Sequence, residues 1–278
     1  MVQYVVNKSN IFDRELISIM DELPLWSAPF GLSLLDKMKI GKHLTVLDIG
    51  SGTGFPLIEI AQRLGETSMV YGIDPWTEVI DRAQLKIAKY GIKNIVLISG
   101  YAEKLPFENF FFDIIVSNNG INNVEDLNKT LSECSRVSKK GSQFLFTMNL
   151  DLSMKEFYDV LKDELEKENN KNAVENIKKH IYTKRRPLNE IKQLLIENSF
   201  KINEISENEF YLRFADGSSM FNHSFIKNWF LDSWKKIIEP GYPEPVFEKI
   251  EKRLNKHAEE NGELKLTVPF AVIDCVRL

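Results

Sequence analysis

Short apolar runs alternate with segments of helical periodicity between residues 44 and 150, and this alternation limits the folds open to the chain. The apolar runs are 44–50, 69–74, 94–99, 112–119 and 143–150. Continuous apolar strands that alternate with helices are typical of a parallel sheet covered by helices on both faces. Right-handed crossovers between such strands give a doubly wound α/β fold, in which ligands bind beyond the carboxyl ends of the strands.

Proline and glycine mark the ends of the helices that we predict in this region. A helix over 56–64 opens on a proline and stops at Gly65, and a second over 75–90 does the same and stops at Gly91. Proline in the first turn and glycine just past the last are the expected boundaries of a helix. A third helix is predicted over 125–137.

The pattern changes after residue 150. We expect helices over 155–179, 187–199 and 218–258, and strands over 201–214 and 264–278. The segment 155–179 is rich in lysine, glutamate and asparagine, and we interpret it as a solvated helical excursion. The two further strands complete a seven-stranded, mostly parallel, Rossmann-like sheet. We therefore predict an N-terminal helical cover over 1–40, a ligand-binding α/β domain over 41–215 and 263–278, and a helical insertion over 216–262.

Composition narrows the class of protein. Hydrophobic residues make up 43% of the chain, enough for a packed core, and the formal net charge is −4. Without a strong positive field, phosphate neutralisation is weak, and a nucleic-acid partner is disfavoured. Two distant cysteines give neither a disulfide framework nor a metal-binding spacing, so we expect no metal. Because we find no signal-like or membrane-spanning apolar run, we expect a soluble, cytoplasmic protein.

A glycine-rich loop follows the first predicted strand and precedes a helix. It reads Asp-Ile-Gly-Ser-Gly-Thr-Gly-Phe-Pro over 48–56. A phosphate-binding Walker loop requires Gly-Lys-Ser/Thr, and this loop has no lysine. A dinucleotide fingerprint requires glycine or alanine where Phe55 stands, and the carboxylate of Asp48 would repel a pyrophosphate. The acid favours a ligand that presents a cation.

Four motifs in order resemble those of class I S-adenosylmethionine-dependent methyltransferases. They are VLDIGSGTGFP over 46–56, GIDPW over 72–76, SGYAEKLPF over 99–107 and FDIIVSNN over 112–119. The similarity is greatest to the type 11 group, which includes enzymes of ubiquinone and menaquinone biosynthesis, and it covers about residues 40 to 150. This resemblance implies S-adenosylmethionine as cofactor and methyl transfer as the activity. It does not identify the acceptor.

The resemblance also implies roles for individual residues around the loop. Gly50, Gly52 and Gly54 should pass beneath the methionine and ribose of the cofactor, with Ser51 between them. Asp48 should meet the cofactor's ammonium, either directly or through water, by a charge-assisted contact.

Further cofactor contacts are implied beyond the loop. Asp74, at the end of the second strand, should bind the ribose hydroxyls, although it could be only a helix cap. Pro75 and Trp76 match positions that flank the adenine, and Asn118 matches one that contacts the methionine moiety.

The segment 101–103 completes the set at the adenine edge. Ala102 should lie there through its backbone amide, between Tyr101 and Glu103. Tyr101 departs from the family, which usually has an aspartate that receives the adenine amino group, so the resemblance does not imply this contact for Tyr101.

Substrate contacts are harder to assign, because the core fold leaves the substrate to its additions. Trp26 and Phe30 could form a wall of the methyl-transfer site, or could pack the N-terminal segment onto the sheet. The aromatic insertion 216–262 could cover a pocket, bury its own core or form an interface. His223, within it, is the candidate general base and substrate contact. The run 184–186 could bind an acidic group, but a solvated charge cluster is the simpler interpretation.

The sequence therefore predicts an S-adenosylmethionine-dependent methyltransferase with a small-molecule substrate. A binding protein that holds the cofactor without catalysis remains an alternative, and a nicotinamide dehydrogenase is a more distant one. The segment 117–120 lacks the Asn-Pro-Pro-Tyr type of signature seen in many amino-group methyltransferases, which weakens a nucleic-acid role.

Overall fold

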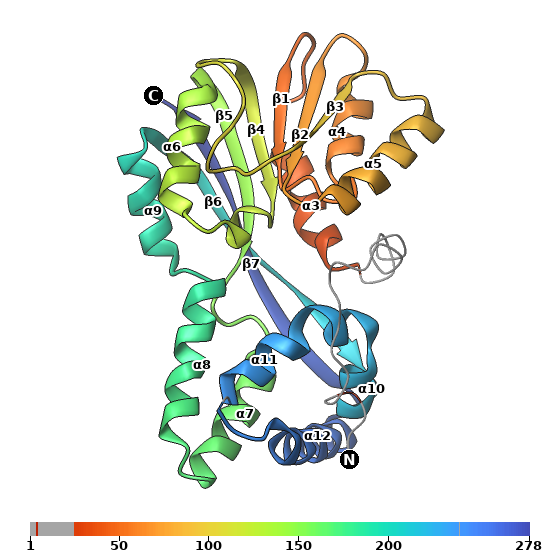
Figure 1. Cartoon of the computed structure of the whole chain (residues 1–278), viewed down its shortest axis with the longest axis vertical. Helices are drawn as coiled ribbons and strands as arrows, with labels where there is room; N and C mark the ends of the chain where they lie inside the picture. Colours follow the sequence, from red (N-terminus) through yellow and green to blue (C-terminus); the bar gives the residue numbers. More distant parts are fainter. Residues whose placement is uncertain (1–3, 5–24, 239) are drawn as a thin grey trace. The chain divides into compact units, whose positions relative to one another are not determined.

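A seven-stranded sheet organises the computed structural model of the chain, which describes residue 4 and residues 25–238 and 240–278 (Figure 1). The strand order is β3-β2-β1-β4-β5-β7-β6. The strands are β1 (Thr45–Ile49), β2 (Met69–Asp74), β3 (Ile95–Ser99), β4 (Phe112–Asn118), β5 (Ser138–Asn149), β6 (Phe200–Phe214) and β7 (Leu264–Arg277). β1 pairs in parallel with β2 and β4, β2 with β3, and β4 with β5, whereas β7 runs antiparallel to β5. The predicted mostly parallel α/β fold is confirmed.

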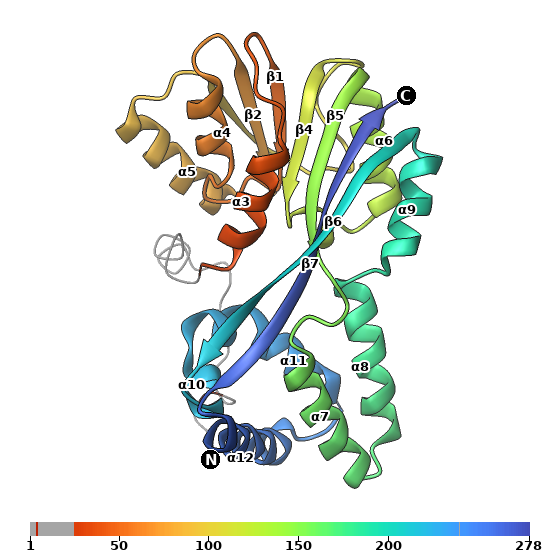
Figure 2. The ribbon, with the colours of Figure 1, turned by 180° about the vertical axis from the view of Figure 1, so that it is seen from behind.

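The chain divides into two compact units, described here by their residues. Of the described residues, the first unit, called the α/β unit, contains 25–149, 187–208 and 270–278, and the second, called the helical unit, contains residue 4, 150–186, 209–238 and 240–269. β6 and β7, seen side by side in Figure 2, contribute residues to both units.

The helices of the α/β unit are α3 (Ser27–Lys37), α4 (Leu57–Leu64), α5 (Thr77–Tyr90), the short 3-10 helix η1 (Ile121–Asn123), α6 (Leu127–Val137) and α9 (Leu188–Glu197). The ranges predicted from the sequence agree closely for α4, α5, α6 and α9, whereas α3 and η1 had no predicted bounds. Gly65 and Gly91 end α4 and α5 with positive φ angles of 70° and 67°, conformations that glycine adopts without steric cost. Asp126 caps α6 by accepting a hydrogen bond from the Lys129 amide.

The helical unit consists of α7 (Lys155–Lys167), α8 (Lys171–Lys184), α10 (Gly217–Asn222), the π-helical segment η2 (Ile226–Phe230), α11 (Leu231–Ile238) and α12 (Pro243–Asn261). Its core is aromatic: the Phe157 and Trp234 rings stack with centroids 3.8 Å apart, and Phe221 and Phe247 pack beside them. Much of the aromatic content of the insertion therefore buries its own core, one of the alternatives that the sequence left open.

The interpretation of 155–179 as a solvated excursion is wrong for α7. Phe157, Leu161 and Leu165 are fully buried, at the helical spacing of one face. Their partners come from α12 and from Trp234 of α11, more than sixty residues away in sequence, so local charge density concealed the buried stripe. The structure thus groups 150–186 with 209–269, a grouping that the sequence did not indicate.

Among the described residues, no helix is long and apolar enough to cross a membrane.

Candidate functional site

The glycine loop is fixed to the carboxyl ends of β1 and β2 by main-chain hydrogen bonds. The amides of Gly50 and Ser51 both donate to the Ile73 carbonyl, at 2.9 and 3.2 Å. Gly50, with φ of 73°, also passes close to Gly120: a Cβ at position 50 would lie 3.0 Å from the Gly120 Cα. The loop therefore needs glycine for its left-handed turn and for the approach of two backbones.

Gly52 forms the open part of the loop. Its φ is 52°, and a Cβ built there would meet no atom within 4 Å. Its amide donates to Asp74 Oδ2 at 3.0 Å, and Asp74 Oδ1 accepts from the Trp76 amide at 3.0 Å. Asp74 therefore fixes both the loop and the start of α5 while it remains 8% exposed.

Asp48 lies beneath the loop, and no cationic side chain among the described residues pairs with it. It is 0% exposed, and neither carboxylate oxygen has a hydrogen-bond partner. Burial raises the pKa of Asp48 well above its usual range, and the Asp74 carboxylate raises it further. The nearby Leu57 amide lowers the pKa of Asp48 only in part. Ser51 Oγ is likewise buried without a partner.

These features fit a cationic, hydrogen-bonding ligand at the loop. Two carboxylates converge there, and burial raises the pKa of Asp74 as well, although the Trp76 and Gly52 amides partly oppose it. Such a site repels phosphate, whereas a positive group close by would stabilise the ionised acids. Because Asp48 is fully buried, its influence on an ammonium would be indirect. Of the two contacts that the sequence left open, direct and water-mediated, this favours the water-mediated one.

Asn118 is placed beside the loop but is already engaged. Its Nδ2 donates to the Ser27 carbonyl at 3.1 Å, and its Oδ1 accepts from Thr147 Oγ1 at 3.0 Å. The side chain thus ties α3 and β5 to the end of β4. The amide has a structural role that the sequence did not indicate, and its predicted contact with methionine stays a prediction.

Ser117 and Gly120 are site residues that sequence reasoning missed. Ser117 Oγ donates to the Ile49 carbonyl at 2.9 Å and accepts from the Ile121 amide, which holds the turn after β4 against β1. At Gly120 a Cβ would lie 2.6 Å from the Ile49 carbonyl oxygen. The glycine after β4 was a signal that could have indicated this close approach.

The residues predicted to contact the adenine differ in solvent exposure. Tyr101 is 64% exposed and Ala102 is buried; Pro75 is exposed and Trp76 half-buried. Glu103 has a local role: its Oε1 accepts hydrogen bonds from the amides of residues 125 and 126, at 2.8 and 3.3 Å.

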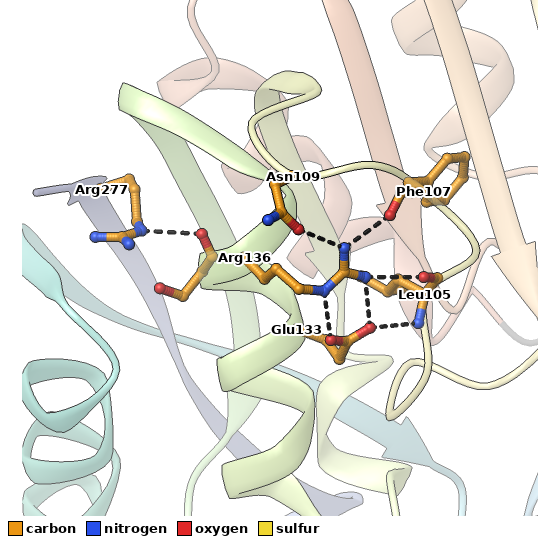
Figure 3. A network of polar contacts seen from close by, with 7 residues as sticks. Leu105, Phe107, Asn109, Glu133, Arg136 and Arg277 are labelled. Atoms are coloured by element: carbon orange, nitrogen blue, oxygen red, sulfur yellow. Dashed lines mark hydrogen bonds and ion pairs between the residues drawn. The ribbon is translucent and has the colours of Figure 1, made fainter.

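A network centred on Arg136 holds the segment that follows Glu103 (Figure 3). The guanidinium pairs with Glu133 at 2.7 Å and donates to the carbonyls of Leu105 and Phe107 and to Asn109 Oδ1. The Leu105 amide donates to Glu133 at 2.8 Å, and the Arg136 guanidinium holds the pKa of Glu133 below its usual range. The network joins 105–109 to α6, and it does so through contacts about thirty residues apart in sequence that no motif indicated.

Of the three residues predicted for the substrate, Trp26 and Phe30 belong to the α/β unit and His223 to the helical unit. Phe30 is fully buried between Trp26 and Phe270, with ring centroids 5.4 and 4.8 Å away; it packs α3 onto the sheet, the second of its two interpretations. Trp26 beside it is half-buried. His223 belongs to the helical unit, where its Nδ1 accepts from the Phe225 amide at 3.3 Å and its ring contacts Phe214. These contacts support a structural role for His223.

Comparison with known proteins places the chain in one family. A family model described as a methyltransferase domain matches residues 40–239, more than half of the chain. A demethylmenaquinone methyltransferase of Geobacillus stearothermophilus is 32% identical over 108 residues, which cover 39% of this chain and 46% of the relative. The chain thus spans about half the length of the curated relatives it matches.

Solved structures agree in fold at low sequence identity. The YcgJ protein from Bacillus subtilis superposes with a TM-score of 0.59 at 20% identity, over 90% of this chain and 98% of that one. A SAM-dependent methyltransferase from Aquifex aeolicus superposes with a TM-score of 0.55 at 16% identity, over 95% of this chain and 98% of that one. The predicted resemblance is confirmed: the chain belongs to the methyltransferase domain family.

Proposed function

We propose that this protein transfers a methyl group from S-adenosylmethionine to a small-molecule acceptor. The observation that carries the proposal is the Asp48 carboxylate, buried and unpaired beneath an open glycine loop. A buried acid without a partner is costly in the ligand-free protein, and a cationic cofactor at the loop would offset that cost. Family membership supports the same activity.

The loop and its acids have distinct roles in this proposal. Gly50, Gly52 and Gly54 let the backbone approach the cofactor, and Asp48 sets a negative potential beneath it. Asp74 is 8% exposed, so its carboxylate can accept hydrogen bonds from ribose hydroxyls while it also accepts the hydrogen bond from the Gly52 amide. Trp76, Pro75 and the segment 101–103 would surround the adenine.

The proposed reaction does not require the protein to supply a nucleophile or a metal. S-adenosylmethionine, when bound, supplies an electrophilic methyl group. The protein then has to align the acceptor and exclude water, which can lower a barrier by roughly 7–11 kcal/mol. This accounts for a site without an evident nucleophile. The contribution of Trp26 and His223 to the acceptor site and the cytoplasmic location stay predictions.

Transfer of a radiolabelled methyl group from S-adenosylmethionine to small molecules of a cell extract tests the proposal. Label in the small-molecule fraction that depends on the protein is the expected result. Saturable binding of S-adenosylhomocysteine with no transfer to any fraction would instead support the alternative, a non-catalytic cofactor-binding protein. Binding of NAD without a response to S-adenosylhomocysteine would contradict both.

Replacing Asp74 with asparagine is expected to weaken S-adenosylhomocysteine binding about 5- to 10-fold. Asparagine keeps one acceptor oxygen but loses the charge that strengthens a hydrogen bond to a hydroxyl, a loss of roughly 1–1.5 kcal/mol. Calorimetric titration measures the change, with the exposed Asp151→Asn as the matched control. Equal affinity in Asp74→Asn and the control would remove Asp74 from the ribose site.

Cofactor affinity is expected to rise with pH. The pKa values of Asp48 and Asp74 are raised in the free protein, and a bound ammonium favours the ionised form of Asp48. Binding therefore releases protons, and the dissociation constant of S-adenosylhomocysteine should fall as pH rises from about 4 through the raised pKa values and then level off. Titrations across this range, repeated in buffers of different ionisation enthalpy, report the protons released. A constant affinity would contradict the proposed ammonium contact.

A further inference from the structure

Arg185 is a buried arginine, and two of its guanidinium nitrogens lack hydrogen-bond partners. It follows the last residue of α8, is 3% exposed, and its Nε and Nη1 atoms are buried without a hydrogen bond. Among the described residues no carboxylate forms an ion pair with it. An arginine stays charged in a protein, and a buried charge is costly unless it is paired and hydrogen-bonded. The expectation that 184–186 is a solvated cluster is therefore wrong for its central residue.

Other arginines of the chain show the usual arrangement. Arg253, also in the helical unit, pairs with Asp163 and Glu164, each at 2.9 Å. Arg136 pairs with Glu133 and donates to several carbonyls. Both are more exposed than Arg185 and so have less need of a partner. Arg185 combines the deepest burial of the three with two unpaired nitrogens.

An aromatic ring faces Arg185, and no carboxylate in the described part of the chain pairs with it. The guanidinium carbon lies 5.3 Å from the centroid of the Tyr158 ring. The Tyr158 hydroxyl accepts from Trp234 Nε1 at 3.1 Å, which leaves its own hydrogen able to donate. The His180 ring lies 6.0 Å from that of Tyr158. Burial, Arg185 and Lys184 together lower the pKa of His180 to about 4, so its ring is neutral near pH 7.

Two local interactions favour the cation without satisfying its donors. The Tyr158 ring offers a cation–π contact, and the C-terminal end of α8 carries the negative end of the helix dipole. Neither accepts the Nε and Nη1 hydrogen bonds. What would satisfy them is an oxyanion, whose lone pairs match guanidinium donors.

We propose that Arg185, with the Tyr158 hydroxyl as a second donor, binds an anionic oxygen group, a carboxylate or a phosphate, in the helical unit. The proposed site consists of the positive charge of Arg185 and the polar edge of the Tyr158 ring, and Tyr158 in turn contacts Trp234 and His180. This inference goes beyond the proposed methyl transfer and does not depend on it, because all the residues that carry it belong to the helical unit.

Calorimetric titration of the full chain tests the site with two probes, inorganic phosphate and acetate, each at ionic strength held constant with sodium chloride. The wild type should show saturable binding of at least one probe, and the tighter of the two identifies the anionic group. Arg185→Met should weaken this binding by at least about tenfold, as expected when a charged hydrogen-bond donor is removed. Arg186→Met, the neighbouring arginine in the same run, should bind as the wild type does.

A titration with S-adenosylhomocysteine serves as the check on folding in every variant and should not change with Arg185→Met. This readout separates the anion site from the cofactor site, so either can fail alone. If Arg185→Met does not fold, Arg185→Lys replaces it, since lysine keeps the charge but loses the planar set of donors and should bind the anion more weakly. No saturable binding of either probe by the wild type, or equal binding by the folded Arg185 variants, would overturn the proposal.

Discussion

Asp48→Asn should weaken S-adenosylhomocysteine binding roughly 10- to 100-fold, because a hydrogen-bonding interaction assisted by a charged group contributes about 1.5–3 kcal/mol. Asparagine keeps the shape of the buried side chain and removes only its charge. Calorimetric titration measures the loss, and Asp151→Asn, an exposed acid on the same chain, should bind normally.

The same substitution should stabilise the ligand-free protein. The pKa of Asp48 is higher in the folded than in the unfolded protein, so its unfavourable effect on folding appears as pH rises above about 4, the unfolded value, and is complete above the folded pKa. The free energy of unfolding of Asp48→Asn should therefore exceed that of the wild type by an amount that grows with pH. Urea unfolding at about pH 4 and about pH 8 measures the difference. A destabilised variant at the higher pH would show that Asp48 has a structural partner.

Gly52→Val is the second substitution with a large expected effect, a roughly 5- to 150-fold loss of S-adenosylhomocysteine affinity. The methyl groups of valine would enter the space that is open above the loop, where we place the cofactor, and overpacking of this kind costs about 1–3 kcal/mol. The left-handed backbone at position 52 adds strain of roughly 1–2 kcal/mol to the folded protein.

Gly91→Val is the matched control for this experiment. Gly91 also lies in the left-handed region, with φ of 67° and ψ of 28°, and has open space around its Cβ position, but it follows the last residue of α5. Both variants should lose similar stability in urea, and only Gly52→Val should lose affinity. Equal affinity in the two variants would show that the space above Gly52 is not the cofactor site.

Sequence reasoning succeeded where the signal is local. The apolar runs predicted β1 to β4 to within a residue at each end, and Gly65 and Gly91 marked the ends of two helices. β5 was predicted over 143–150 but begins at Ser138, so its first five residues were missed. The loop 48–56 and the acid at position 74 were placed together because parallel strands bring their carboxyl ends to one edge of a sheet. The pairing of Asp48 with Gly72 in neighbouring strands shows this register.

Sequence reasoning failed where a side chain is hydrogen-bonded to, or packed against, a residue that is distant in sequence. The Asn118 amide is engaged by Ser27, ninety-one residues away, and α7 is buried against α12 rather than solvated. Exposure and hydrogen bonding of this kind depend on which segments meet, and no short window of sequence contains both members of the pair.

The sequence by itself determined the layered α/β architecture, the glycine loop and the character of its ligand, because periodicity and turn geometry are properties of neighbouring residues. Only the tertiary structure decided that Asp48 is buried without a partner and that Arg185 is enclosed rather than solvated. Burial sets the electrostatic cost of a charge, and burial arises when segments distant in sequence pack together.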